Sequence, residues 1–161
     1  PPRSTLFPYT TLFRSSIAKG LCFGEDGPKF ISVPTLAAFA CSAAELAALE
    51  KSAGITAAIA GHKDFIFYQE FTAAGAEQGE PQIIEARQFS EMDFTGKVVC
   101  GTASGLAGGA ATLAGLQILS PAHIARLAYK LYMEGKFSAA EDFVPMYIMD
   151  FQPKTKKVTE L

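Results

Sequence analysis

Apolar residues recur every three or four positions in three stretches of the chain, which is the spacing of one helix face. The stretch 16–24 predicts the last two turns of a helix that Gly24 terminates. The stretch 121–134 predicts the clearest helix, because Pro121 can open it and Gly135 can end it. The apolar stripe of this helix consists of Ile124, Leu127, Ala128 and Leu131.

The third stretch follows Pro34 and is predicted to contain two helices. A capping-box pattern, Ser42-Ala-Ala-Glu45, indicates that a second helix begins within this stretch. That helix would run to Gly54 and turn two leucines, Leu46 and Leu49, toward the core.

Period-two alternation and short apolar runs predict strands in the rest of the chain. A hairpin is expected where the run 55–60 and the alternating segment 65–71 flank the turn 61–63. The other expected features are strands at 30–33, 82–86, 97–100 and 116–119, a turn at 79–81 and an extended segment at 144–148. Helices and strands that alternate in this way predict an α/β or α+β domain.

Composition and charge narrow the class of protein. The 161 residues suit one domain, and the formal net charge is −2. The only cationic run lies at 154–157, and we interpret it as solvated terminal charge, so nucleic-acid binding by this chain alone is not expected. Three widely spaced cysteines indicate free thiols in a reducing compartment, and no apolar run is long enough for a membrane span. We therefore predict a cytoplasmic protein.

The glycine-rich stretch 101–109 follows a predicted strand and is the strongest candidate for a phosphate-binding loop. It contains neither G-K-[S/T] nor G-x-G-x-x-G, the two nucleotide fingerprints. Close packing of small residues against a sheet explains the same glycines and is the favoured alternative.

No spacing in the sequence points to a catalytic or metal site. His62 and His123 have no second ligand at metal-binding distance along the chain. Ser42 and Ser104 lie outside any G-x-S-x-G pattern, and Cys100 belongs to a predicted buried strand. The carboxylates that could pair across strands are Asp64, Glu70, Glu85 and Glu91, and nothing selects two of them. We therefore predict no catalytic residue, cofactor or metal.

Two segments resemble the bacterial TsaB (YeaZ) family: Ile17-Ala-Lys-Gly-Leu-Cys-Phe-Gly24 and Ile31-Ser-Val-Pro-Thr-Leu-Ala-Ala-Phe-Ala40. Further matches follow in the family's order and end with Val144-Pro-Met-Tyr-Ile148. The segment 59–67 departs from the family's I-D-A-R-x-G-E-V-Y pattern. The resemblance implies an α/β domain of the actin/Hsp70/sugar-kinase-like (ASKHA) fold that is incomplete and lacks its N-terminal strands.

Three parts of the chain are expected. Residues 1–15 resemble the in-frame translation of a sequencing-library adapter, so we expect them to be an artefact outside the domain. Residues 16–150 would be a partial TsaB-like α/β domain, and residues 151–161 a polar C-terminal tail.

The resemblance implies a non-catalytic scaffold and activating subunit of the complex that makes N6-threonylcarbamoyladenosine at position 37 of tRNA. Its partners would be a TsaD-like catalytic subunit, a TsaE-like ATPase in the same complex and, as a further option, a second copy. It would meet tRNA only through the complex and need no cofactor. The partner surface is expected on the N-terminal helix, at Ile17 and Leu21.

Two alternatives stay open. The first is an ATP-using enzyme of the same superfamily, TsaD-like or kinase-like, in which the 101–109 loop would contact phosphate or adenosine. The second is a truncated fragment without independent function.

Overall fold

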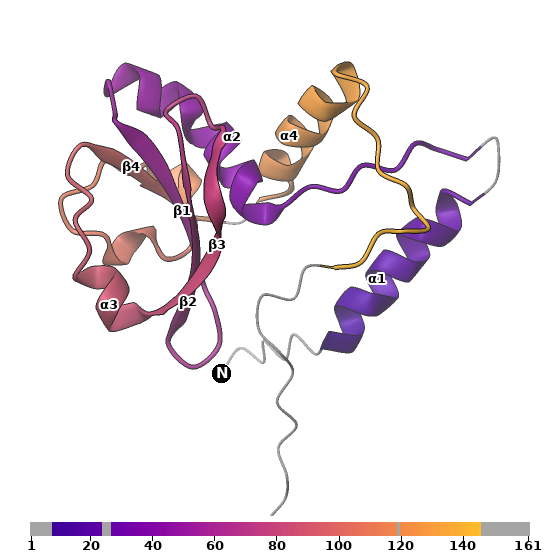
Figure 1. The fold of residues 1–161 in the computed structure, drawn as a ribbon, viewed down its shortest axis with the longest axis horizontal. Coiled ribbons are helices and arrows are strands. Elements are labelled where there is room, and N and C mark those ends of the chain that lie inside the picture. Colours follow the sequence, from indigo (N-terminus) through magenta and orange to yellow (C-terminus); the bar gives the residue numbers. More distant parts are fainter. Residues whose placement is uncertain (1–7, 24–26, 119, 146–161) are drawn as a thin grey trace, which may run out of the picture.

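A four-stranded mixed sheet lies at the centre of the computed structural model, which describes residues 8–23, 27–118 and 120–145 (Figure 1). The strands are β1 (Gly54–Ala60), β2 (Phe65–Phe71), β3 (Glu77–Glu85) and β4 (Lys97–Cys100), arranged as β3-β2-β1-β4. β1 is antiparallel to β2 and parallel to β4, and β2 is antiparallel to β3. The helices are α1 (Pro8–Leu21), α2 (Thr35–Leu49), α3 (Ala86–Ser90) and α4 (Pro121–Met133), with 3-10 turns η1 (Ser104–Leu106) and η2 (Ala114–Leu116).

The two faces of the sheet carry separate apolar cores. On one face, α2 buries Phe39, Ala43 and Ala47 against the sheet, and Leu127 of α4 packs against the same cluster. On the other face, α3 and the loop after it bury Phe89 and Phe94. Successive residues of a strand point to opposite faces, so each central strand serves both cores.

The β1–β2 hairpin confirms the prediction from alternation. Its turn is closed by the Gly61 amide, which donates to the Phe65 carbonyl at 2.7 Å. Lys63 and Asp64 both adopt a positive φ, of 56° and 61°. Short loops between antiparallel strands need such left-handed residues to match the strand twist.

β3 begins five residues earlier than predicted, and the expected turn at 79–81 is wrong. The chain reverses instead at 72–76, where the Thr72 amide donates to the Ala76 carbonyl at 2.8 Å. Gly79 lies inside the strand at a φ of 84°, beside a register irregularity opposite Gln69. The Gln69 side chain donates to the Gly79 carbonyl, so the glycine signals a bulge rather than a turn.

α2 is a single helix, so the two helices predicted after Pro34 are wrong. Ser42 does not cap a helix, because its side chain is buried and faces α4. Leu46 packs against the core as expected, whereas Leu49 is exposed, contrary to the prediction. The alanine-rich sequence favours an unbroken helix, and its burial on the sheet stabilises it further.

Two other strand predictions are wrong. The segment 30–33 is irregular. It is hydrogen-bonded to the C-terminal part of the chain, because the Ser138 amide donates to the Phe30 carbonyl at 2.9 Å. The segment 116–119 is not a strand up to residue 118; residue 119 is outside the described residues. Leu116 is buried because it packs into the core cluster that includes residues of α2.

α4 confirms its prediction closely. The Ser120 side chain accepts a hydrogen bond from the Ala122 amide, and Pro121 occupies the first turn. Gly135 follows the helix at a φ of 68°, as a terminating glycine should. The predicted apolar stripe is half-buried along its length.

α1 ends at Leu21, three residues before the predicted stop, and it begins at Pro8. The boundary expected after residue 15 therefore falls inside this helix, and the adapter origin of residues 1–15 stays a prediction. The predicted tail at 151–161, the cationic run and most of the extended segment 144–148 lie outside the described residues.

Candidate partner interface

α1 stands apart from the sheet (Figure 1). Within 8–23, 27–118 and 120–145, it packs extensively on no other helix or strand. Ile17 and Leu21, the predicted partner contacts, are 65% and 69% exposed, and Phe13 is as exposed one turn earlier. Three large apolar side chains spaced four residues apart share one helix face, as in helices that dock into grooves. That these residues bind a partner stays a prediction.

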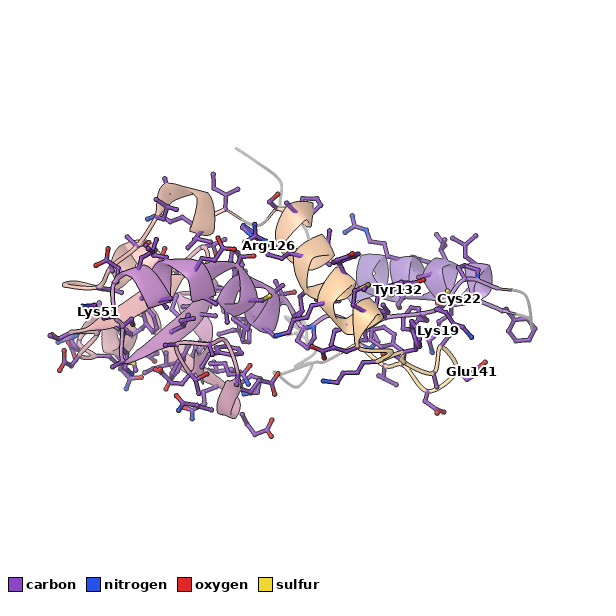
Figure 2. All side chains as sticks on the ribbon, turned by 90° about the horizontal axis from the view of Figure 1, so that it is seen from above. Lys19, Cys22, Lys51, Arg126, Tyr132 and Glu141 are labelled. Carbon is purple, nitrogen blue, oxygen red and sulfur yellow. The ribbon has the colours of Figure 1, made fainter. Side chains whose placement is uncertain are left out.

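The C-terminal part of the chain holds α1 in place. Lys19 of α1 donates from Nζ to the Glu141 carbonyl at 3.2 Å, and Figure 2 shows the two residues near one another. The connection from α1 to α2 is tied to the same segment, because the Ser32 amide donates to Ser138 Oγ at 3.1 Å. Both contacts are made by polar groups, and neither involves Phe13, Ile17 or Leu21, which stay largely exposed.

The structure brings together Ser42 and His123, two residues that the sequence left without partners. His123 Nδ1 lies 3.0 Å from Ser42 Oγ, and its Nε2 lies 3.2 Å from the Gly115 carbonyl oxygen. The carbonyl can only accept, so Nε2 carries a hydrogen; in the tautomer with its hydrogen on Nε2, Nδ1 accepts from the Ser42 hydroxyl. No sequence spacing could reveal this pair, because 81 residues separate its members.

A serine beside an imidazole is the core of a nucleophile–base pair, but the surroundings of Ser42 favour a structural contact. Ser42 is only 8% exposed and sits inside α2. Amides inside a helix donate to carbonyls of the preceding turn, so they cannot stabilise an oxyanion. Phe39 packs on the imidazole at 5.2 Å between ring centroids. The pair therefore joins α2, α4 and the η2 turn.

The amides of the 101–109 loop are largely engaged within the protein. The Gly101 amide donates to the Leu116 carbonyl at 2.7 Å, and the Ala103 amide donates to the Ala58 carbonyl at 3.1 Å. The amides of Ser104, Leu106 and Ala107 close local turns. Only a single 3-10 turn, η1, follows the strand, so the loop does not form the phosphate-binding strand–turn–helix arrangement. Close packing explains Gly101, where a Cβ would collide with the Ala58 carbonyl, but it does not explain Gly105, Gly108 or Gly109, where a Cβ would meet no atom within 4 Å.

Cys100 is a buried strand thiol, as expected. Burial raises the pKa of its thiol to about 12, and Sγ lies 3.8 Å from the Thr56 carbonyl oxygen. A thiol that stays protonated at neutral pH is a poor nucleophile. Ser104 is also buried, and its Oγ has no hydrogen-bond partner among the described residues.

The four candidate carboxylates do not pair with one another. Glu70 accepts from Lys97 Nζ at 3.1 Å and lies 3.0 Å from Oγ1 of the fully buried Thr56. Glu91, the residue after α3, forms an ion pair with Arg87 of α3. The Thr56–Glu70–Lys97 contact was not predicted, because it depends on the parallel pairing of β1 with β4. It resembles a satisfied polar row on a sheet rather than an acid–base pair.

His62 lies exposed in the hairpin turn. In the described part of the chain, no three His, Cys, Asp or Glu side chains come together as a metal site would require. None of the helices described is both long enough and apolar enough to span a bilayer.

Two solved structures share this fold. One is the crystal structure of an uncharacterized protein with similarity to peptidase YEAZ from Pseudomonas aeruginosa, 17% identical, aligned over 86% of this chain and 67% of its own, with a TM-score of 0.63. The other is YeaZ from Pseudomonas aeruginosa, 18% identical over 84% of this chain and 67% of its own, with a TM-score of 0.60. No protein-family model and no curated protein sequence matches this sequence. The chain therefore has a mixed α/β fold similar to that of the YeaZ structures.

Proposed function

We propose that this chain is a non-catalytic scaffold and activating subunit of the TsaB type, acting in the complex that makes N6-threonylcarbamoyladenosine at position 37 of tRNA. The observation that carries this proposal is the fold shared with YeaZ structures over most of the described chain. It agrees with the resemblance of the segments 17–24 and 31–40 to the TsaB family. The ASKHA architecture and a cytoplasmic location belong to the same proposal.

The partner is a TsaD-like catalytic subunit, and α1 is the surface that binds it. Ile17 and Leu21 support this assignment because both are largely exposed on a helix that no other element covers among the described residues. Burying such side chains at an interface removes apolar area from water at about 25 cal/mol per Å². A TsaE-like ATPase joins the complex, and tRNA is bound by the assembly rather than by this chain alone.

Three side chains that could take part in catalysis support a scaffold instead, because each is buried or engaged in a structural contact. Ser42 and His123 join helices, the Cys100 thiol is buried, and the amides of the 101–109 loop donate to nearby carbonyls. An ATP-using enzyme would have to bind phosphate elsewhere.

One observation favours a second candidate, a hydrolase. The name of the first structural neighbour contains the word peptidase, and the Ser42–His123 contact of 3.0 Å is short enough for proton transfer. The burial of Ser42 opposes this function, and the same experiment tests it.

The experiment uses the tagged chain and the TsaD-like subunit from the same genome. Stable co-purification, with neither ATP hydrolysis nor ester or peptide hydrolysis by the chain alone, is the expected result. ATP hydrolysis without binding would favour the ATP-using enzyme. Hydrolysis that Ser42→Ala abolishes would favour the peptidase, provided that the circular dichroism of the variant is unchanged.

A further inference from the structure

α4 presents a second apolar face that the core does not use. Its inner stripe packs toward α2 through Leu127. Tyr129, Tyr132 and Met133 lie at i, i+3 and i+4 on the other side of the helix, and are 67%, 55% and 66% exposed. We call these three residues the α4 outer patch. Large side chains exposed singly are ordinary, whereas three contiguous ones expose roughly 350 Å², the size of patches that often bind partners.

The α4 outer patch is flanked by cations. Arg126 and Lys130 form an exposed basic ridge along one side, and Figure 2 shows Arg126 near the start of the helix and Tyr132 near its end. Among the residues that the structure describes, the one ion pair of Arg126 is a long contact of 3.9 Å with Glu45. Glu134, the one carboxylate on this turn, is neutralised by Lys136 at 2.8 Å. The local charge is therefore positive, although the whole chain has a net charge of −2.

A further cation lies beyond the end of the helix. The Tyr132 ring packs edge-on against Phe137, with centroids 5.8 Å apart, and Lys29 Nζ lies 6.0 Å above the Phe137 ring. Tyr132 is thereby held in one position, which lowers the entropic cost of using it as a contact.

We propose that the α4 outer patch binds an acidic amphipathic helix of a second partner protein, with that helix's apolar residues on Tyr129 and Met133 and its carboxylates beside Arg126 and Lys130. Charge complementarity supports this occupant, because the cations flank the apolar side chains instead of surrounding a polar groove. The surface lies on a different helix from Ile17 and Leu21, so it goes beyond the TsaD-like contact.

Nucleic acid is the less favoured occupant. Phosphate binding draws on grouped cations and gains little from a methionine and two tyrosines at a convex helix surface. A groove that binds single-stranded RNA usually combines many cations with stacking platforms. Two cations in one ridge beside an apolar patch suit a peptide better.

The test measures binding of the full chain to a synthetic 16-residue amphipathic peptide by fluorescence anisotropy. The acidic probe carries Leu at i, i+3, i+4 and i+7 and Glu at the flanking positions; the matched basic probe carries Lys in place of Glu. We expect the acidic probe to bind at least about tenfold more tightly, with an affinity that falls as salt rises.

Variants locate the binding surface. Tyr129→Ser with Met133→Ser should weaken binding of the acidic probe at least about tenfold, whereas Lys130→Glu should reverse the preference toward the basic probe. Leu49→Ser, which removes an apolar side chain of α2 that is more exposed still, at 81%, is the matched control and should change nothing. Lys130→Glu alters an exposed charge, so it remains informative if the double variant fails to fold.

Several results would overturn the proposal. One is equal binding of both probes. Another is a loss of probe binding in Leu49→Ser as large as that in the double variant. Single-stranded polyuridylate that binds more tightly than the acidic probe, and loses binding with Lys130→Glu, would make RNA the occupant. A dimer that Met133→Ser dissociates would make a second copy the occupant. A tenfold rise in probe affinity on removal of residues 146–161 would make the chain's own tail the occupant.

Discussion

At the residue scale, Gly101 shows how backbone geometry constrains the turn after β4. Its φ is 96°, in the left-handed region, and a Cβ at this position would collide with the Ala58 carbonyl. The same carbonyl accepts the Ala103 amide at 3.1 Å, so it cannot move aside without loss of that bond. Gly101 is therefore required for close packing of the loop on β1, independently of any ligand.

Gly101→Ala should destabilise the fold by about 3 kcal/mol or more, because backbone strain and a backbone collision add. Gly108→Ala is the matched control, since a Cβ there meets no atom within 4 Å. We expect its effect to stay within about 1 kcal/mol. Urea unfolding followed by circular dichroism measures both, and equal midpoints would contradict the packing account.

Cys100 should resist alkylation in the folded protein, while Cys22 and Cys41, both half-buried, should react. The pKa of the Cys100 thiol is about 12 when folded and about 9 when unfolded, so stability should fall as the pH rises between these values. Iodoacetamide labelling at pH 8 with peptide mass spectrometry checks the first point. Rapid labelling of Cys100 without denaturant would show that the thiol is accessible.

At the scale of elements, α4 contacts α2 through its apolar stripe, through the part-buried Ser42–His123 contact and through the long, exposed Arg126–Glu45 ion pair. Ser42 and His123 meet across the two helices, and the imidazole also reaches the Gly115 carbonyl. A buried hydroxyl or imidazole that loses its partner costs the full desolvation of that group. The contact therefore fixes how α4 lies, and with it where the α4 outer patch points.

Ser42→Ala and His123→Ala should each lower the free energy of unfolding by about 1 to 2 kcal/mol, and the double variant should cost less than the sum. Ser90→Ala is the control, because Ser90 donates only to the Arg87 carbonyl at an exposed site. A double-mutant cycle by thermal unfolding provides the coupling energy. Strict additivity would mean that the two side chains contribute independently.

Helices and strands are predicted correctly from the sequence where several local signals agree. They are predicted incorrectly where tertiary contacts determine the local structure. The hairpin at 55–71 and α4 follow from alternation, a proline start and a glycine stop. The capping-box pattern at 42–45 misleads, since burial of the alanine-rich helix outweighs it. Gly79 is read as a turn although it serves a bulge, because both uses need a positive φ.

The candidate site could be predicted only in part. The helical spacing of residues 16–24 predicts the end of α1, and the resemblance to the TsaB family implies a partner surface at Ile17 and Leu21. Both side chains are exposed in the structure, and their binding to a partner stays a prediction. The Ser42–His123 contact and the Thr56–Glu70–Lys97 row join residues far apart in sequence. Such contacts depend on strand order and helix placement, for which a single sequence contains no local signal.

At the scale of the whole molecule, apolar side chains are buried on the sheet but exposed on two of the helices. The sheet is covered on both faces by two cores, whereas α1 and the outer side of α4 leave large side chains in water. Figure 1 shows α1 apart from the sheet. Together these features describe a sheet domain with two helices whose large apolar side chains lie in water, which is an arrangement that the proposed scaffold role requires.

The central claim is that α1 binds a TsaD-like subunit, and isothermal titration calorimetry of the chain against that subunit tests it most directly. Ile17→Asp with Leu21→Asp should weaken the affinity at least about tenfold, because each carboxylate would be desolvated in an apolar contact. Leu49→Asp places the same charge on an exposed apolar position of α2 and should leave the affinity unchanged. No measurable binding of the unaltered chain, or equal losses in all variants, would contradict the account.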